Sequence, residues 1–286
     1  MYSTKIFSKN FISNFQLLED FSIQTKQIPG TQITLTPGTY PNTHQQQCTE
    51  KHEDGSLSYI WPNEASYKIS IDGIKILPHK EVFLPAIRES LLGPVMGIAF
   101  HLNKSAVFHG ASIVSKNNNG ILLLGDSGMG KSTLSALALN KDARILSDDI
   151  SVLSDELTHL EPSWPTIRLS SSLGNKLHLK ECEEIVVTGR EKKAYHLSDY
   201  QFCKDTVPLT TIYILARGEN ECESISSGDA LKHLMDNIYT KALLDNKALQ
   251  NYFNSCTSIL KKHSVKILKS ECGDKGIEWA LNTILA

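Results

Sequence analysis

The sequence lacks an excess of charge of either sign. Its 286 residues include 29 lysines and arginines against 31 aspartates and glutamates, which gives a formal net charge of −2. Such a balance provides no long-range field that would draw the chain onto DNA or an anionic membrane. We therefore predict that neither nucleic acid nor a membrane is a partner.

Long hydrophobic runs are also missing. The most apolar stretches, such as 95–100 and 121–124, are far shorter than the ~20 residues of a membrane-spanning helix. Residues 1–20 alternate polar and apolar side chains and lack the continuous apolar core of a secretory signal. Both absences predict a cytoplasmic protein without a transmembrane helix.

Cysteines are few and show no metal-binding pattern. The six cysteines form no Cys-x-x-Cys pair and are spread from Cys48 to Cys272. In a chain of this length, that spacing favours reduced thiols over a disulfide framework or a zinc site. The rest of the composition, 41% hydrophobic and 21% charged, is that of an ordinary folded protein with one large or two modest domains.

The hydrophobic pattern predicts a mixed α/β chain. Residues 67–71 alternate before an Asp72-Gly73 turn, which is typical of a hairpin. Residues 86–102 have helical spacing that Gly93-Pro94 should kink or break. Further strands are expected at 106–114, 121–124, 144–147, 150–153, 211–216 and 264–268, and further helices at 131–139, 229–251 and 274–285.

No Pro- or Ser-rich linker divides the chain, and the polar run 41–58 is interpreted as a solvated loop. We place a boundary in the region 90–105. Residues 1–90 are then a β-containing N-terminal region, for which substrate recognition is one role to consider. Residues 91–286 form the nucleotide-binding domain described next.

A glycine-rich loop follows the predicted strand 121–124 and precedes a predicted helix. It reads Gly125-Asp126-Ser127-Gly128-Met129-Gly130-Lys131-Ser132, continues with Thr133, and fits G-x-x-x-x-G-K-[ST]. The glycines let successive N–H groups curl around phosphate oxygens, and the helix N-terminus adds partial positive charge. Lys131 can reach the outer phosphates and the Ser132 hydroxyl can bind Mg²⁺. The loop predicts a nucleoside triphosphate site, and a chance glycine-rich helix cap is the alternative.

Two adjacent acids follow the next predicted strand. Asp148 and Asp149 come sixteen residues after Ser132 (148 minus 132), a gap that holds one helix and one short strand. Both strands can therefore end at the same sheet edge, with the acids beside the loop. Two acids next to a magnesium nucleotide allow one to hold the metal and the other to accept a proton from a substrate hydroxyl. A strand-end turn or a solvated acidic pair is the alternative.

His109 lies on the strand just before the loop, 22 residues before Lys131. A lone histidine on a strand is more often a hydrogen-bonded structural residue than a catalytic one. Its position near the loop and the acidic pair nevertheless makes it a candidate for the site.

The run FHGASIVSKNNNGILLLGDSGMGKSTLSALAL followed by ARILSDDISVL resembles the catalytic domain of HPr kinase/phosphorylase over about residues 105–153. That family is related in fold to phosphoenolpyruvate carboxykinase, so the resemblance implies a mixed-sheet P-loop kinase domain with helices packed on the sheet. It implies ATP as the nucleotide and Mg²⁺ as the metal. By position, Lys131 and the loop amides would bind the phosphates, Ser132 and Asp148 the metal, and Asp149 would be the base, with His109 nearby.

The chain departs from that family after Asp155. The family's Gly-rich signature segment, whose Glu assists metal binding, is missing, so we do not expect phosphorylase activity. The segments 161–169 and 190–197 instead resemble HPr-kinase-related proteins of peptide-modification clusters, including lasso-peptide kinases that phosphorylate a precursor-peptide serine. The implied partner is a peptide or small protein that carries a serine. HPr kinases often form hexamers, which leaves a homo-oligomer open here.

Transfer of a phosphoryl group needs cations beyond the loop lysine, because charge spreads over the transferring oxygens. Arg168, Lys192 and Lys193 are the candidates. The alternatives are a surface position for Arg168 and a solvated charged hairpin for the two lysines.

The leading hypothesis is an ATP- and Mg²⁺-dependent serine kinase. A non-catalytic nucleotide sensor or pseudokinase with the same loop is the main alternative, because the family's metal-assisting Glu is missing. A small-molecule phosphotransferase is the third, although no oxaloacetate-binding set is recognisable.

Overall fold

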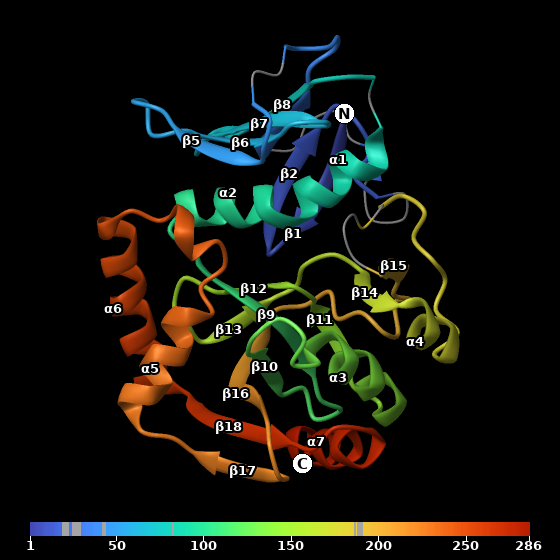
Figure 1. The fold of residues 1–286 in the computed structure, drawn as a ribbon, viewed down its shortest axis with the longest axis vertical. Helices are drawn as coiled ribbons and strands as arrows, with labels where there is room; N and C mark the ends of the chain where they lie inside the picture. Colours follow the sequence, from blue (N-terminus) through green and yellow to red (C-terminus); the bar gives the residue numbers. More distant parts are fainter. Residues whose placement is uncertain (19–22, 25–29, 42–43, 82, 186, 188–190) are drawn as a thin grey trace. The chain divides into compact units, whose positions relative to one another are not determined.

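The computed structural model describes residues 1–18, 23–24, 30–41, 44–81, 83–185, 187 and 191–286 (Figure 1). The chain forms two compact units. The first contains Met1–Lys104 and Cys182–Arg190, and the second contains Ser105–Glu181 and Glu191–Ala286. The mixed α/β class predicted from the sequence is confirmed.

The described part of the first unit is built on an eight-stranded sheet with the order β3-β1-β2-β4-β8-β7-β6-β5. The predicted hairpin is present: β7 and β8 pair antiparallel around a turn in which Ser70 N donates to Gly73 O at 2.9 Å. The prediction of a loop over 41–58 is wrong in part, because β5 and the start of β6 lie there, while residues 42–43 are outside the described residues. The strands are β1 (Tyr2–Ile6), β2 (Lys9–Ser13), β3 (Ile23–Gln24), β4 (Thr31–Leu35), β5 (Cys48–Lys51), β6 (Leu57–Trp61), β7 (Ala65–Ile69) and β8 (Gly73–Pro78).

A kinked helical segment covers this sheet. It consists of α1 (Leu84–Ser90), a π-helical turn η2 (Leu91–Val95) and α2 (Met96–Leu102). Leu92 and Gly93 have non-helical backbone angles, as expected beside Pro94. The Phe100 ring packs on the ring of Phe7, with centroids 5.0 Å apart. With α2 packed on the sheet in this way, the compact unit includes the chain up to Lys104.

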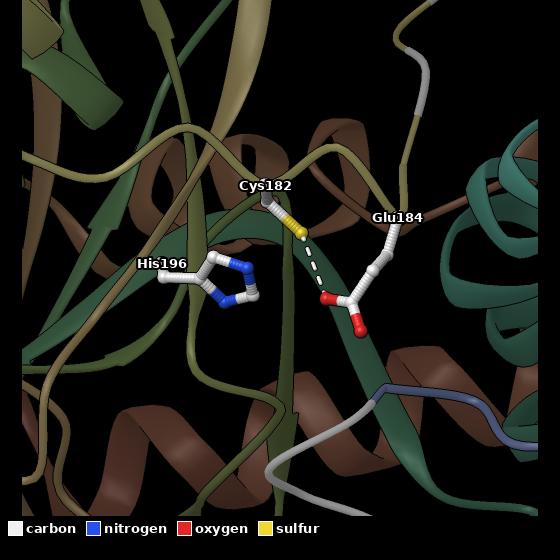
Figure 2. Close-up of side chains that lie close together, drawn as sticks. All are labelled: Cys182, Glu184 and His196. Carbon is white, nitrogen blue, oxygen red and sulfur yellow. Dashed lines mark hydrogen bonds between the residues drawn. The ribbon is translucent and has the colours of Figure 1, made fainter.

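The segment that begins at Cys182 is tied to the first unit by Arg88. The Arg88 guanidinium donates to Gln16 O at 2.8 Å and to Glu184 O at 3.5 Å. The Cys182 thiol donates to a Glu184 carboxylate oxygen at 3.5 Å (Figure 2). Burial raises the pKa of Cys182 to about 12, so it is a protonated thiol at neutral pH and not a reactive thiolate.

The second unit contains a mixed sheet that is centred on the long strand β9. The first half of β9 pairs antiparallel with β12, and its second half pairs with β10 and β11. Strand β16 runs parallel to β10 on one side and to β18 on the other. The strands are β9 (Ala106–Val114), β10 (Gly120–Leu124), β11 (Arg144–Ser147), β12 (Ile150–Leu153), β13 (His159–Glu161), β16 (Val207–Arg217), β17 (Glu221–Ser224) and β18 (Ser264–Ser270).

Helices cover both faces of this sheet (Figure 1). Helices α3 (Lys131–Ala138) and α7 (Asp274–Leu285) pack against each other, as do α5 (Ser227–Asp236) and α6 (Asn246–Lys262). Apolar residues of α5 and α6, among them Leu234 and Ile259, join Leu122 and Leu124 of β10 in one buried core. Among the described residues, no helix combines the length and apolarity needed to cross a bilayer.

The predicted helix 229–251 is wrong, because two helices occupy this region. Thr240 has a left-handed φ of 49°, and the short turn η4 (Lys241–Leu243) follows it. Asp245 then caps a new helix by accepting a hydrogen bond from Ala248 N at 2.8 Å. The chain leaves α5 because the residues after it pair with β9 instead.

A separate two-stranded sheet completes the second unit. It pairs β14 (Thr166–Ser170) with β15 (Lys192–His196), and α4 (Ser171–Lys176) follows β14. Strand β14 lies beside the acidic pair, because its Arg168 contacts both Asp148 and Asp149.

Candidate nucleotide and phosphoryl-transfer site

The glycine-rich loop joins β10 to α3, as the sequence predicts. Gly125, Gly128 and Gly130 all have positive φ, between 89° and 137°, a conformation that other residues adopt with strain. A Cβ on Gly125 would lie 2.8 Å from Leu215 O, so that position also excludes a side chain for lack of space. Gly128 and Gly130 have open space around them, and the loop tip with Asp126 and Ser127 is exposed. This loop has room for phosphate groups.

Lys131 begins α3 with its side chain folded into the loop. Its buried ammonium donates to Gly125 O and, at 3.2 Å, to Asp126 O. Burial lowers the pKa of Lys131, while the nearby charges of Asp149 and Asp148 act in the opposite direction. The lysine is thus held inside the loop, the position from which the lysine of such a motif can reach outer phosphates. The half-buried Thr133 lies in the same first turn.

Ser132 and Asp148 meet across the loop. The Ser132 hydroxyl donates to Asp148 Oδ1 at 2.8 Å, and Arg168 N donates to Asp148 Oδ2 at 3.0 Å. β11 ends at Ser147, so Asp148 emerges at the sheet edge next to the helix that carries Ser132. A hydroxyl and a carboxylate are hard oxygen ligands of the kind Mg²⁺ binds, so this pair fits a magnesium nucleotide.

Asp149 faces a different set of partners. Its backbone is left-handed, with φ of 71°, and its Oδ1 lies 3.3 Å from His109 Nδ1. Its Oδ2 lies 3.4 Å from Arg168 Nη1. Each of the three residues is a separate candidate in the sequence, and the tertiary structure brings them into one half-buried cluster.

The two lysines at the start of β15 are placed differently. In the β14–β15 register, Arg168 is opposite Ala194, Ser170 opposite Lys192, and Leu169 opposite Lys193. Residues two apart share a face, so Lys192 lies on the face of Arg168 and Lys193 on the other. The positive charge of Lys192 contributes to the lowered pKa of Lys131, whereas Lys193 pairs with Glu181 at 2.7 Å. We therefore keep Lys192 in the candidate site and leave Lys193 out.

The positions of Lys192 and Lys193 predict that replacing each with alanine has a different effect on the affinity for Mg-ATP. Lys192→Ala is expected to weaken Mg-ATP binding several-fold, because it removes a charge close to the phosphate loop. Lys193→Ala is expected to leave the affinity within about twofold, because screened exposed ion pairs contribute little. Titration of both variants with a fluorescent ATP analogue checks this, and equal effects would contradict the assignment of faces.

Burial of Asp148 predicts a gain in stability when its charge is removed. Desolvation raises the pKa of Asp148, so its ionised form is disfavoured in the folded protein. A raised folded pKa gives stability that is present at low pH and lost as pH rises through that pKa. In Asp148→Asn, the amide oxygen can accept from Arg168 N and the amide nitrogen can donate to the Ser132 hydroxyl. This variant should therefore have a higher unfolding temperature than the wild type at pH 7 in EDTA.

The same gain should shrink as the pH falls and wild-type Asp148 becomes protonated. The matched control is Asp142→Asn, because Asp142 is an exposed aspartate of the same unit. An unfolding temperature of Asp148→Asn below that of the wild type at pH 7 would contradict the prediction.

Two further residues contact the loop and are not among those predicted from the sequence. Arg217 ends β16, the strand beside β10, and its Nη2 donates to Gly128 O at 3.5 Å. Asn237 Oδ1 accepts a hydrogen bond from Gly125 N at 2.9 Å, although the two residues are 112 positions apart. A basic residue at the end of a strand next to β10 is a signal that could have indicated Arg217. No local pattern indicates Asn237.

Comparisons with known proteins find distant structural similarity to solved structures. No protein-family model matches the chain, and no curated protein matches it. One similar solved structure is that of the Hpr(Ser) kinase/phosphatase from Coxiella burnetii. The superposed region covers 61% of this chain and 91% of the Coxiella chain, with 12% sequence identity and a TM-score of 0.31. At this level the similarity bears on neither the reaction nor the substrate.

Proposed function

We propose that this chain is a Mg²⁺- and ATP-dependent kinase that transfers the γ-phosphoryl group of ATP to a serine hydroxyl of a peptide or small protein. Support comes from the phosphate loop and from the neighbouring acids, which face different partners. Asp148 lies 2.8 Å from the Ser132 hydroxyl, while Asp149 lies between His109 and Arg168. This division of partners is the observation on which the proposal rests.

The residues fit an in-line transfer. The serine Oγ attacks the γ-phosphorus, the bond to the β–γ bridging oxygen breaks, and ADP leaves as the hydroxyl proton passes to Asp149. The loop amides and Lys131 hold the phosphates, and His109 and Arg168 orient the Asp149 carboxylate. A Mg²⁺ held by Ser132 and Asp148 would neutralise phosphate charge.

Arg168 links the two acids. Its backbone N–H bonds Asp148 and its guanidinium contacts Asp149, so one β14 residue fixes both carboxylates relative to each other. Charge that develops on the transferring oxygens would be met by Lys131, Arg168 and Lys192, since preorganised cations stabilise such a transition state.

A nucleotide sensor without catalysis is the second candidate. The sequence lacks the metal-assisting Glu segment of HPr kinases, which favours this alternative. A sensor would use the same loop and Ser132–Asp148 pair to bind nucleotide, but it would not need the Asp149 cluster.

Mass spectrometry separates the candidates. The purified full chain is incubated with Mg-ATP and a panel that contains HPr and serine-terminated precursor peptides, with a reaction lacking ATP as the control. The kinase proposal expects a phosphate on a serine of a panel member. ATP binding with no phosphate transfer to any panel member favours the sensor, and phosphate found only on small molecules favours a small-molecule phosphotransferase.

A further inference from the structure

Asn237 occupies an unusual place at the end of α5. It is buried, with 8% of its surface exposed, and it is the residue at which the helix ends. Its side-chain Nδ2 donates to His233 O at 2.8 Å, one turn back in the helix. Its Oδ1 points to the phosphate loop and accepts from Gly125 N at 2.9 Å. Both ends of the amide are therefore bonded.

The backbone of the same residue holds the histidine strand. His109 N donates to Asn237 O at 2.7 Å, and Tyr239 N donates to Val107 O at 3.0 Å. The next residue, Ile238, forms an antiparallel bridge with Phe108. The short segment after α5 thus acts as a strand along the first half of β9.

This pairing begins where β10 leaves β9. The last β10–β9 pair is Leu124 with Gly110, and from Gly125 the chain turns into the loop. An N–H that leaves a ladder in the protein interior needs a new partner, because an unpaired buried amide is costly. The Asn237 side chain supplies that partner at the first residue of the loop.

We infer that Asn237 is a positioning residue, which sets the phosphate loop in register with the His109–Asp149 pair. Its side chain holds the loop at Gly125 and its backbone holds His109, whose ring lies 3.3 Å from Asp149 Oδ1. One residue therefore links the group that binds phosphate to the group that accepts the proton. The inference rests on the proposed function, since both groups are assigned by it.

The test uses Asn237→Ser in the full chain. Serine can still donate to the carbonyl four residues back, as helical serines often do, but it is too short to reach Gly125 N. The matched control is Asn103→Ser. Asn103 ends α2 with the same kind of bond, from Nδ2 to Ala99 O at 2.9 Å.

Two measurements are made on both variants. The first is hydrogen exchange of the peptide that spans the loop, without nucleotide. The second is the affinity for Mg-ATP, followed with a fluorescent ATP analogue. For Asn237→Ser we expect faster exchange in the loop and affinity weaker by about tenfold, the size of effect expected from one buried hydrogen bond. For Asn103→Ser we expect neither change, even if its unfolding temperature falls equally.

The outcomes distinguish this inference from the proposed function. Unchanged loop exchange in Asn237→Ser would overturn the anchoring role. Faster exchange with unchanged affinity would overturn the positioning role. If the wild-type chain binds no Mg-ATP, the proposed function fails and the positioning role with it, whereas the exchange data still show whether Asn237 anchors the loop.

Discussion

Lys131→Ala is expected to reduce phosphoryl transfer at least 100-fold, the usual cost of removing one preorganised charge from a site of this kind. The ammonium is buried inside the loop and bonded to two loop carbonyls, so its position is set before nucleotide binds. Alanine leaves the loop glycines in place but removes the charge that meets the outer phosphates. The measurement is the rate of phosphate incorporation into the acceptor, by mass spectrometry at saturating Mg-ATP.

The control for Lys131→Ala is Lys141→Ala. Lys141 lies just beyond the same helix, is exposed, and bonds Asn282 Oδ1 at 2.9 Å. We expect that variant to react at the wild-type rate. If Lys131→Ala also reacts at that rate, the loop does not serve transfer and the proposed function is wrong.

Asp149→Asn is expected to lose about 10²- to 10⁴-fold in turnover while retaining nucleotide binding. General base catalysis contributes an effect of this size, and an amide cannot accept the hydroxyl proton as a carboxylate does. The substitution replaces neither Ser132 and Asp148, which bond each other at 2.8 Å, nor any residue of the loop. Steady-state kinetics should therefore show a reduced kcat with little change in affinity for the ATP analogue.

Asparagine is chosen for this test because it fits the backbone conformation of residue 149. Asp149 has φ of 71°, and Asn tolerates the left-handed region about as well as Asp, whereas Ala would add strain. Asp142→Asn is the matched control, because Asp142 is also left-handed, with φ of 59°, and is exposed. Normal turnover by Asp149→Asn would show that Asp149 is not the base.

Short-range features of the fold could be predicted from the sequence. The strand before Gly125, the helix after it and the kink at Gly93-Pro94 all depend on neighbouring residues, and the structure has each of them. The secondary structure predicted from the sequence is wrong where pairing with a distant segment determines the local structure. The predicted helix 229–251 breaks after Asn237 because that segment pairs with β9, more than 120 residues earlier.

The same distinction applies to the candidate site. Lys131, Ser132 and the glycines belong to one contiguous pattern whose spacing alone predicts phosphate binding, because a strand, a tight turn and a helix N-terminus follow one another in the chain. The sequence also indicates four further candidate site residues, which are Asp148, Asp149, His109 and Arg168. It left a structural or surface role open for each, because spacing along a chain does not specify which way a side chain faces.

Tertiary structure decided which of these residues meet. β11 and β12 pair with β9, and this places Asp149 beside His109, while β14 brings Arg168 to both acids. The register of β14 with β15 places Lys192 and Lys193 on opposite faces. The sequence by itself thus determined the phosphate loop, whose geometry is local. The fold decided the partners of the acids and the role of Asn237, because these depend on hydrogen bonds between segments far apart in the chain.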